Sequence, residues 1–422
     1  MGALNGIRVL DLSRVLAGPW CGQILADLGA EVIKIERPKV GDDTRSWGPP
    51  WMKDDSGQDT QEAAYYQSTN RNKLSVAIDI ASSEGQELIK ALIQDTDVVI
   101  ENYKAGSLKK YGLDYESLSA INPKLVYCSI TGFGQTGPRA EEPGYDFIIQ
   151  GMGGLMSVTG ERDDLPGGGP QKVGVAFSDL ATGLYSTIAI QAALLNRHVT
   201  GLGQYIDMAL LDVQIATMAN QGMNYLSSGN IPKRYGNAHA NIVPYQVFKA
   251  SDRDFIIACG NDTQFIQLCR SIGLPDLPND VRFARNADRI KHRDEIIGIL
   301  QTHFLTKTAD EWVDAIYAAK VPVGVINNLE QAFQEPQVIA REMLVEMNHP
   351  QREKLKVIGS PIKLSRTPVE YKTAPPLLGE HTQAVLGRIV SSETVSYTHL
   401  RAHETICVIW YAVFGLKIGG GG

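Results

Sequence analysis

Cysteine is scarce in this sequence, and its spacing excludes the sites that cysteines usually build. Five cysteines occur among 422 residues, and no two of them form a Cys-x-x-Cys pair. This pattern argues against a disulfide framework or a zinc knuckle and fits a reducing compartment, so we expect a cytoplasmic protein. The histidines before residue 395 show no ligand spacing either, and we therefore expect no metal site.

Long apolar runs and basic blocks are also absent. No apolar run reaches the roughly 18 residues of a membrane span, and no basic region followed by an apolar core opens the chain. The formal net charge is −7, which argues against a nucleic-acid partner. The composition, 43 % hydrophobic and 21 % charged, is globular, and 422 residues exceed what one core usually serves. We expect a soluble protein with more than one domain and no membrane segment.

Strands alternate with helices along the first half of the chain. The spacing predicts strands at Ile7–Leu12, Glu31–Ile35, Ser75–Asp79, Asp97–Glu101, Leu125–Thr131 and Gln204–Met208. It predicts helices at Pro19–Leu28, Ser83–Gln94, Leu180–Asn196 and Ala209–Leu226. This alternation is typical of a large doubly wound, Rossmann-like α/β domain, whose parallel sheet binds ligands at the carboxyl ends of its strands.

A change of composition near residues 228–243 marks a smaller α+β domain. Its predicted elements are a hairpin of Tyr245–Ala250 and Asp254–Cys259, helices at Thr263–Ile272, Asp294–Leu305 and Ala309–Lys320, and a strand at Pro322–Ile326. Thr308 and Glu311 form a capping-box pattern before the last helix. The predicted domains are 1–227 and 228–330, followed by an extended proline-bearing return linker, 331–378, and a return to the large domain, 379–394. The residue pattern of 395–422 differs from that of the preceding chain, and we interpret this segment as a non-native tail.

One glycine motif invites a dinucleotide-binding interpretation. Gly132-Phe-Gly134-Gln-Thr-Gly137 is a literal GxGxxG after a predicted strand. However, Pro138 follows at once, and the next residues do not open the helix whose amides would hold a pyrophosphate. A nicotinamide-dependent oxidoreductase therefore stays an alternative that the motif supports only in part.

Asp179 and two polar clusters have competing interpretations. Asp179 stands at the head of an apolar helix, where an aspartate usually caps the helix but can also serve as a reactive carboxylate. Asn70–Lys73 precedes one predicted strand and Glu101–Tyr103 follows another. The residues of either cluster can stabilise a turn or form part of a ligand site.

Eleven segments, taken in order, resemble the family III CoA-transferases, which include formyl-CoA, carnitine and succinyl-CoA:glutarate CoA-transferases. They extend over about residues 4–390 and are Ile7–Leu12 with Gly18-Pro19, Ile35–Pro38, Gly41–Pro50, Asn70–Lys73, Glu101–Tyr103, Thr131–Pro138, Gly144–Asp146, Val175–Tyr185, Gly203–Asp212, Gly236–Tyr245 and Pro376–Thr382. Gly41–Pro50, Asn70–Lys73 and Asn241–Phe248 most resemble the members that use succinyl-CoA and a dicarboxylate acceptor.

The resemblance implies a ping-pong CoA-transferase with Asp179 as the nucleophile. Its carboxylate would attack the donor thioester, giving a mixed anhydride and CoA thiolate, and the thiolate would then form an aspartyl-CoA thioester. The acceptor carboxylate would reverse these steps. The implied donor is succinyl-CoA and the implied acceptor a dicarboxylic acid, with CoA as a substrate and no tightly bound cofactor. The family also implies a homodimer of interlocked chains. An acyl-CoA racemase of the same fold is the alternative within the family.

The resemblance also assigns residues to parts of the site. It assigns CoA binding to Arg37, Lys73, Asn102, Tyr103 and Lys110. It assigns the lining of the active site to Leu16, Trp47, Tyr145, Asp146, His239 and Asn241. Leu16 stands where the formyl-CoA enzymes carry a polar residue, which argues against oxalate as the acceptor. The resemblance leaves open whether the backbone amides of the loop Gly236–Ile242 or the side chains of His239 and Asn241 stabilise the oxyanion.

The far carboxylate of a dicarboxylate acceptor needs a cation. A guanidinium suits this task because its planar fork can bind a carboxylate through two hydrogen bonds. We therefore predict that Arg14 or Arg45 binds the acceptor.

Overall fold

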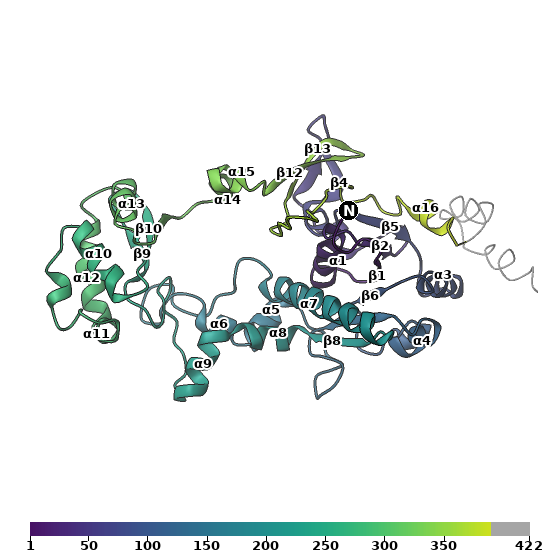
Figure 1. The fold of residues 1–422 in the computed structure, drawn as a ribbon, viewed down its shortest axis with the longest axis horizontal. Coiled ribbons are helices and arrows are strands. Elements are labelled where there is room, and N and C mark those ends of the chain that lie inside the picture. The colour runs from purple at the N-terminus through teal and green to yellow at the C-terminus, as the bar shows by residue number, and fades with distance from the viewer. Residues whose placement is uncertain (390–422) are drawn as a thin grey trace, which may run out of the picture. The chain divides into compact units, whose positions relative to one another are not determined.

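The computed structural model describes residues 1–389, so the predicted non-native tail at 395–422 lies outside the described residues. These residues belong to two compact units, which are described separately below (Figure 1). The first unit contains Met1–Gly154, Gly174–Ala219 and residues 339–389. The second contains Leu155–Val173 and Asn220–Val338. Leu155–Val173 thus clusters with the second unit, whereas the predicted boundaries kept it in the large domain.

The first unit is built on a six-stranded sheet in the order β5-β2-β1-β6-β7-β8. Its strands are β1 (Arg8–Asp11), β2 (Glu31–Glu36), β5 (Lys73–Ala77), β6 (Val98–Glu101), β7 (Val126–Thr131) and β8 (Tyr205–Ala209). Every neighbouring pair is parallel, which confirms the predicted parallel sheet. The chain builds outward from β1 to β5 and then, on the other side, from β6 to β8. The order therefore reverses between β1 and β6, and the carboxyl ends of these strands mark the crevice where such sheets bind ligands.

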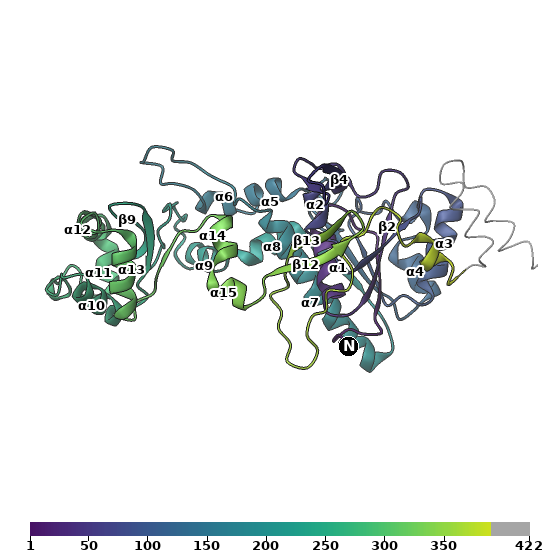
Figure 2. The same cartoon turned by 90° about the horizontal axis from the view of Figure 1, so that it is seen from above.

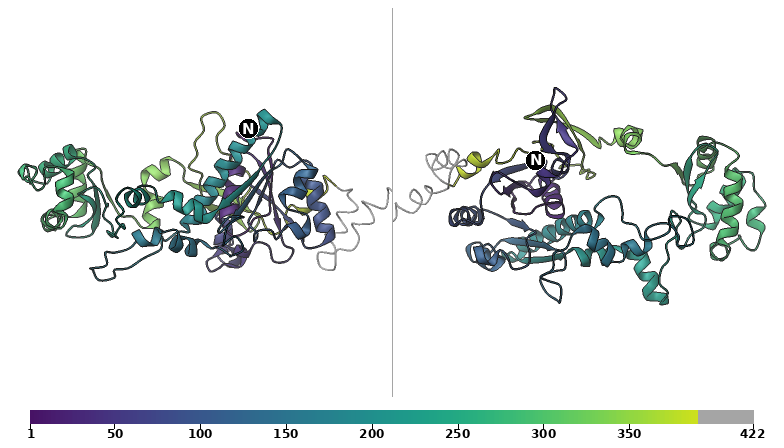
Figure 3. Two further views of the ribbon diagram at one scale, coloured as in Figure 1. Left: turned by 90° about the horizontal axis from the view of Figure 1, so that it is seen from below. Right: turned by 180° about the vertical axis from the view of Figure 1, so that it is seen from behind.

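Helices cover both faces of this sheet, as a doubly wound fold requires (Figures 2 and 3). One face buries Val9, Val32 and Val126 beneath α1 (Ala17–Asp27) and α7 (Phe177–Thr200). The other face buries Leu10, Ile33 and Val99 beneath α3 (Ser83–Ile93) and α4 (Tyr115–Ile121). Neighbouring residues of each strand lie on opposite faces of the sheet. Because both faces are buried, the central strands are rich in apolar residues. The remaining helices of this unit are α2 (Ala64–Gln67), α5 (Asp146–Met152), α8 (Leu210–Thr217) and α16 (Thr382–Leu386), with short 3-10 turns η1 (Asp43–Ser46) and η2 (Lys109–Tyr111).

Helices α1 and α7 pack closely at a glycine. A Cβ on Gly183 would lie 2.7 Å from the Ala17 carbonyl oxygen and 2.9 Å from the Trp20 ring. Thr187, one turn further along α7, donates a hydrogen bond to Cys21 of α1 at 3.4 Å. The two helices therefore run side by side in the same direction, and Asp179, one turn before Gly183, faces the beginning of α1.

The second unit is a small α+β body with its own core. Its antiparallel sheet has the order β11-β10-β9, from β9 (Tyr245–Lys249), β10 (Asp254–Ala258) and β11 (Val323–Val325). Its helices are α6 (Leu155–Val158), α10 (Asp262–Ser271), α11 (Asn286–Lys291), α12 (Arg293–Phe304), α13 (Ala309–Ala318) and α14 (Leu329–Gln334), with a 3-10 turn η3 (Leu277–Asn279). The sequence boundaries between the units fall within α9 (Ala219–Ser228) and α15 (Pro336–Ala340). The predicted hairpin is present, and Thr308 and Glu311 form the predicted capping box.

Two predictions about local structure were wrong. The single helix expected at Ala209–Leu226 is two helices, α8 and α9, because Ala219 takes a left-handed φ of 41°. The segment 331–378, expected to be an extended linker, contains a two-stranded antiparallel sheet of β12 (Leu344–His349) and β13 (Arg352–Ile358). This hairpin packs with Met52 of a second hairpin, β3 (Trp51–Lys53) and β4 (Asp59–Ala63), in a small apolar cluster. No helix within residues 1–389 is long and apolar enough to cross a membrane.

Candidate active site

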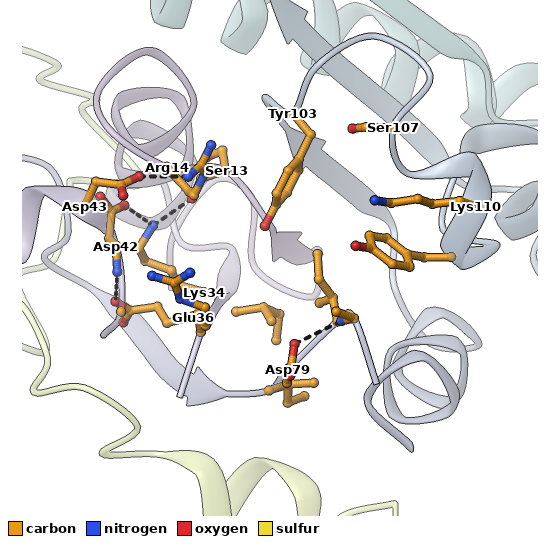
Figure 4. Close-up of a pocket in the computed structure, with 17 residues that line it drawn as sticks. Ser13, Arg14, Lys34, Glu36, Asp42, Asp43, Asp79, Tyr103, Ser107 and Lys110 are labelled. Atoms are coloured by element: carbon orange, nitrogen blue, oxygen red, sulfur yellow. Dashed lines mark hydrogen bonds and ion pairs between the residues drawn. The ribbon is translucent and has the colours of Figure 1, made fainter. Parts of the chain in front are cut away.

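Two cavities of the first unit lie at the carboxyl ends of the strands, at the switch point between β1 and β6. The larger, which we call the Asp179 cavity, has a volume of about 550 Å³ and is lined by Leu16, Trp47, Asn102, Tyr145 and Asp179, among others. The smaller, the Lys110 cavity, has a volume of about 300 Å³ and is lined by Lys34, Arg37, Asp42 and Lys110, among others (Figure 4). Arg14, Asp43 and Tyr103 line both cavities, so the two cavities adjoin.

Asp179 lies in the first turn of α7 but does not cap it. The N-cap position is Ala176, which makes no side-chain capping bond. Asp146 of α5 takes this role, since its Oδ1 accepts hydrogen bonds from the amides of Ser178 at 2.7 Å and Asp179 at 3.3 Å. The Asp146 carboxylate thus satisfies helix amides that would otherwise lack partners, and the carboxylate of Asp179 is left to line the cavity.

The surroundings of Asp179 disfavour its charged form. Burial, together with the nearby negative charge of Asp146, raises the pKa of Asp179 to about 7. Burial and the charges of Asp179 and Asp146 also raise the pKa of Tyr65 to about 12, so this phenol stays protonated beside the two carboxyl groups. The Tyr65 ring packs edge-on against Trp47 at 5.1 Å. A carboxylate with a raised pKa is more basic and hence a stronger nucleophile than an ordinary aspartate.

The loop after β1 reaches the cavity in a strained conformation. Val15 has a φ of 70°, which a β-branched residue adopts only at a cost. The Asn102 side chain fixes this loop, because it accepts from the Arg14 amide at 2.8 Å and donates to the Arg14 carbonyl at 2.6 Å. Asp42 accepts a further hydrogen bond from the Val15 amide at 3.2 Å. Both polar atoms of Asn102 are thus bonded to the loop, and its predicted contact with CoA stays a prediction.

The lining of the Lys110 cavity contains a buried ion pair and two cations that have no acidic partner among the described residues. Lys34 is buried and forms an ion pair with Asp42 at 2.9 Å. Figure 4 shows the Lys110 ammonium pointing into the cavity from the side opposite Lys34 and Asp42, with Tyr103 between them. Within residues 1–389, neither Arg37 nor Lys110 has an acidic partner. The cavity therefore offers two positive charges to an anionic ligand such as a phosphate.

The structure corrects the assignment of Lys73 to CoA binding. Lys73 is fully buried, and its ammonium donates to Asp11, to the Pro19 carbonyl and to Asn70 at 2.8–3.0 Å. Burial lowers the pKa of Lys73 to about 8, although Asp11 opposes this effect. With three bonds inside the protein and no exposed surface, Lys73 cannot reach a ligand in either cavity. It joins β5 to β1 and α1 instead.

The structure likewise corrects the assignment of Arg45 to the acceptor. Its guanidinium binds both oxygens of Glu36, at 2.8 and 2.9 Å, and one oxygen of Glu62 at 3.1 Å. It also stacks over the Tyr66 ring at 3.7 Å. Arg45 is buried and does not line the Asp179 cavity, whereas Arg14 lines it and pairs with Asp43 at 2.8 Å.

His239 and Asn241 belong to the second unit. The His239 Nδ1 accepts from the Asn241 amide at 3.0 Å, so a neutral His239 carries its proton on Nε2. Arg293 donates to the carbonyls of His239 and Ala240 at 3.0 and 2.8 Å and thereby holds the backbone of this loop. It stays a prediction that His239 and Asn241 line the active site. The choice of groups that stabilise the oxyanion also stays a prediction.

Known proteins are similar to this chain over most of its length. CoA-transferase family III matches residues 4–382. The chain belongs to CoA-transferase family III. The succinate–glutarate CoA-transferase of Agrobacterium fabrum is 50 % identical over 390 residues, which cover 92 % of this chain and 96 % of that relative. The succinyl-CoA:glutarate CoA-transferase of Mus musculus is 43 % identical over 390 residues, covering 92 % and 87 %.

A solved structure extends the similarity to the fold. The crystal structure of a CAIB/BAIF family protein from Brucella suis superimposes with a TM-score of 0.81 at 49 % sequence identity, covering 92 % of this chain and 99 % of that one. The family III CoA-transferase described here is therefore an enzyme that uses CoA thioesters as substrates. The nicotinamide alternative was wrong, and the structure gives the reason, because no helix opens between Gly137 and α5 to hold a pyrophosphate.

Sequence reasoning missed several residues in or near the Asp179 cavity. Tyr65 comes from α2 and was not singled out. Lys104, Thr131 and Glu142 line the Asp179 cavity, and none of them was proposed. Lys104 had a signal in the sequence, since it follows directly on Glu101–Tyr103. Within residues 1–389, no group of three or more His, Cys, Asp or Glu side chains could hold a metal ion.

Proposed function

We propose that this CoA-transferase moves CoA from succinyl-CoA to a dicarboxylic acid through an aspartyl-CoA thioester on Asp179. One observation carries the proposal: a carboxyl group with a pKa near 7 lines a cavity that shares three residues with a second, cation-bearing cavity. This arrangement suits CoA, whose charged nucleotide end and reactive thioester end are joined by a long, flexible arm.

The environment of Asp179 favours its acylation. The ionised carboxylate is disfavoured by burial and by Asp146, whereas a mixed anhydride or a thioester at the same position is neutral. Attack on the donor carbonyl therefore moves the negative charge from the buried Asp179 carboxylate to the sulfur of the leaving CoA thiolate. Each later intermediate is another activated acyl group of similar energy, so no step is steeply uphill.

The nucleotide end of CoA fits the Lys110 cavity. Arg37 and Lys110 supply the positive charge for its phosphate groups, and Tyr103 stands where the arm would pass to the Asp179 cavity. The donor and acceptor classes rest on the relatives, which are named for succinate or succinyl-CoA and glutarate.

We further propose that the enzyme is a cytoplasmic homodimer of interlocked chains. Large apolar side chains of α7 stay exposed in the single chain, with Ile188 62 %, Leu195 73 % and Val199 84 % exposed, and such a surface is expected to be covered by another chain. The four cysteines within residues 1–389 are free and buried, which fits a reducing compartment. Light scattering of the purified enzyme checks the dimer, and a monomeric mass would contradict it.

A product assay tests the reaction. The enzyme is incubated with succinyl-CoA and one acid at a time from a panel of glutarate, other dicarboxylates, butyrate and other monocarboxylates, and the new CoA thioesters are separated by chromatography. We expect dicarboxylyl-CoA products and stoichiometric free succinate. Products from the monocarboxylates alone would contradict the proposal and favour a different acceptor class. In a separate incubation with a 2-methylacyl-CoA and no acid, epimerisation by an enzyme that transfers no CoA from succinyl-CoA would favour the racemase alternative.

A further inference from the structure

Lys104 occupies a fixed place at the switch point of the sheet. It lies three residues after the end of β6, and its carbonyl accepts from the Ser107 amide at 2.9 Å, which closes a tight turn. Gly106, with a φ of 71°, supplies the left-handed residue that such a turn needs. The turn therefore fixes the Lys104 backbone, and the exposed side chain of Lys104 lines the Asp179 cavity.

The other charged groups of this cavity neutralise one another or have partners outside it. Arg14 pairs with Asp43 at 2.8 Å, and both line the cavity. Glu142, also in the lining, pairs with Arg139 at 2.8 Å. Among the residues that the structure describes, this leaves one carboxylate and one ammonium without an ion pair, Asp179 and Lys104. The cavity thus presents a nucleophile and a separate positive charge.

We infer that Lys104 is the residue that selects dicarboxylic substrates, by binding the far carboxylate of the acyl group whose thioester carbonyl faces Asp179. The inference rests on the proposed function and names the recognition element of that same site. In a ping-pong reaction, the donor acyl group and the acceptor acid occupy the site in turn. One ammonium can therefore serve both succinyl-CoA and the acceptor.

The properties of a lysine suit this task better than those of a fixed guanidinium. Its ammonium sits on a flexible four-carbon stem and carries three donors, so it can follow carboxylates on chains of different length. Arg14, by contrast, already binds Asp43 and lies 5.2 Å from the Tyr103 ring, and Arg45 is buried. A substrate carboxylate would therefore have to displace Asp43 from Arg14, while Lys104 needs no such exchange.

Donor selectivity tests the inference. Succinyl-CoA and butyryl-CoA both have a four-carbon acyl chain, and only the first ends in a carboxylate. For Lys104→Met, we expect kcat/KM for succinyl-CoA to fall about tenfold, as for loss of one charge-assisted contact at a partly exposed site, with kcat/KM for butyryl-CoA unchanged. Lys104→Arg should keep most of the preference for succinyl-CoA, because it keeps the charge.

Lys109→Met is the matched control, since Lys109 lies on the same segment, pairs with Glu116 at 3.6 Å and lines neither cavity. It should leave both donors unaffected. An equal loss for succinyl-CoA and butyryl-CoA in Lys104→Met would overturn the inference in favour of a contact with CoA itself, and no loss would overturn it outright. Either result leaves the proposed function standing if the wild-type enzyme still transfers CoA; a wild type that transfers no CoA from succinyl-CoA refutes the function itself.

Discussion

The carboxylate of Asp146 caps the helix that carries Asp179, and the same carboxylate raises the pKa of Asp179. Its Oδ1 accepts from the amides of Ser178 and Asp179 at 2.7 and 3.3 Å. Its charge adds to burial in disfavouring the ionised form of Asp179. Asp146 therefore positions Asp179 and, after burial, contributes to its raised pKa.

The charge of Asp146 is testable through the pH dependence of the reaction. The nucleophile must be ionised, so wild-type kcat/KM is expected to fall as pH drops through about 7. Asp146→Asn keeps an oxygen that can cap α7 but removes the charge, so the midpoint of this acid limb should move to lower pH. An unchanged midpoint would contradict the electrostatic role. Asp146→Ala removes the cap as well, and its unfolding free energy should fall by about 1 kcal/mol.

The raised pKa of Asp179 also makes a prediction about stability. The folded pKa of about 7 lies above the ordinary value of 3.8, so ionised Asp179 destabilises the fold at high pH, and this cost disappears below about pH 4. Asp179→Asn should therefore stabilise the protein by about 1–3 kcal/mol at pH 8 and by almost nothing at pH 4. Urea unfolding at both pH values measures this difference. The surface variant Asp95→Asn is the control, and a gain of Asp179→Asn over the wild type that is no larger at pH 8 than at pH 4 would refute the prediction.

Arg45 is expected to stabilise the fold rather than bind the acceptor. Arg45→Met would leave Glu36 and Glu62 without their buried cation, and breaking a buried ion pair on one side costs about 3–5 kcal/mol. Arg45→Lys keeps the charge but loses the fork and should lose less. Chemical denaturation measures both variants, and KM for glutarate should stay unchanged in Arg45→Lys. A stable variant with a raised KM for glutarate would restore the predicted role in acceptor binding.

Asn102 is expected to hold the strained loop at Val15. Asn102→Ala removes both hydrogen bonds to the Arg14 backbone, so Val15 can leave its left-handed conformation and move Leu16. We expect kcat/KM to fall at least about tenfold and stability to fall by about 1–3 kcal/mol. Glycine adopts a positive φ without strain, so adding Val15→Gly should restore part of the activity. Full activity of Asn102→Ala would argue against this role of Asn102 in holding the loop. So would a double variant with lower activity than Asn102→Ala alone.

Elements that form through residues close together in the sequence could be predicted from the sequence. The six strands of the parallel sheet show as short apolar runs, and the capping box needs only Thr308 and Glu311. The break between α8 and α9 could not, because the residues on both sides of Ala219 are all compatible with a helix.

Side-chain roles that depend on distant partners were harder to predict. Lys73 meets Asp11 across 62 residues, so the sequence shows a cation after a turn but not its buried ion pair. The role of Arg45 was mispredicted for the same reason, because its partners Glu36 and Glu62 come from separate elements. Lys104 was missed because its lack of an acidic partner among residues 1–389 shows only in the structure, where Arg14 and Glu142 have theirs.

Intact-mass spectrometry of the enzyme tests the covalent role of Asp179 most directly. After incubation with succinyl-CoA alone, the wild-type chain should gain the mass of CoA less one water, and added glutarate should remove this adduct as glutaryl-CoA forms. Asp179→Ala should show neither the adduct nor the product. A CoA adduct on Asp179→Ala, or continued transfer by that variant, would contradict the account.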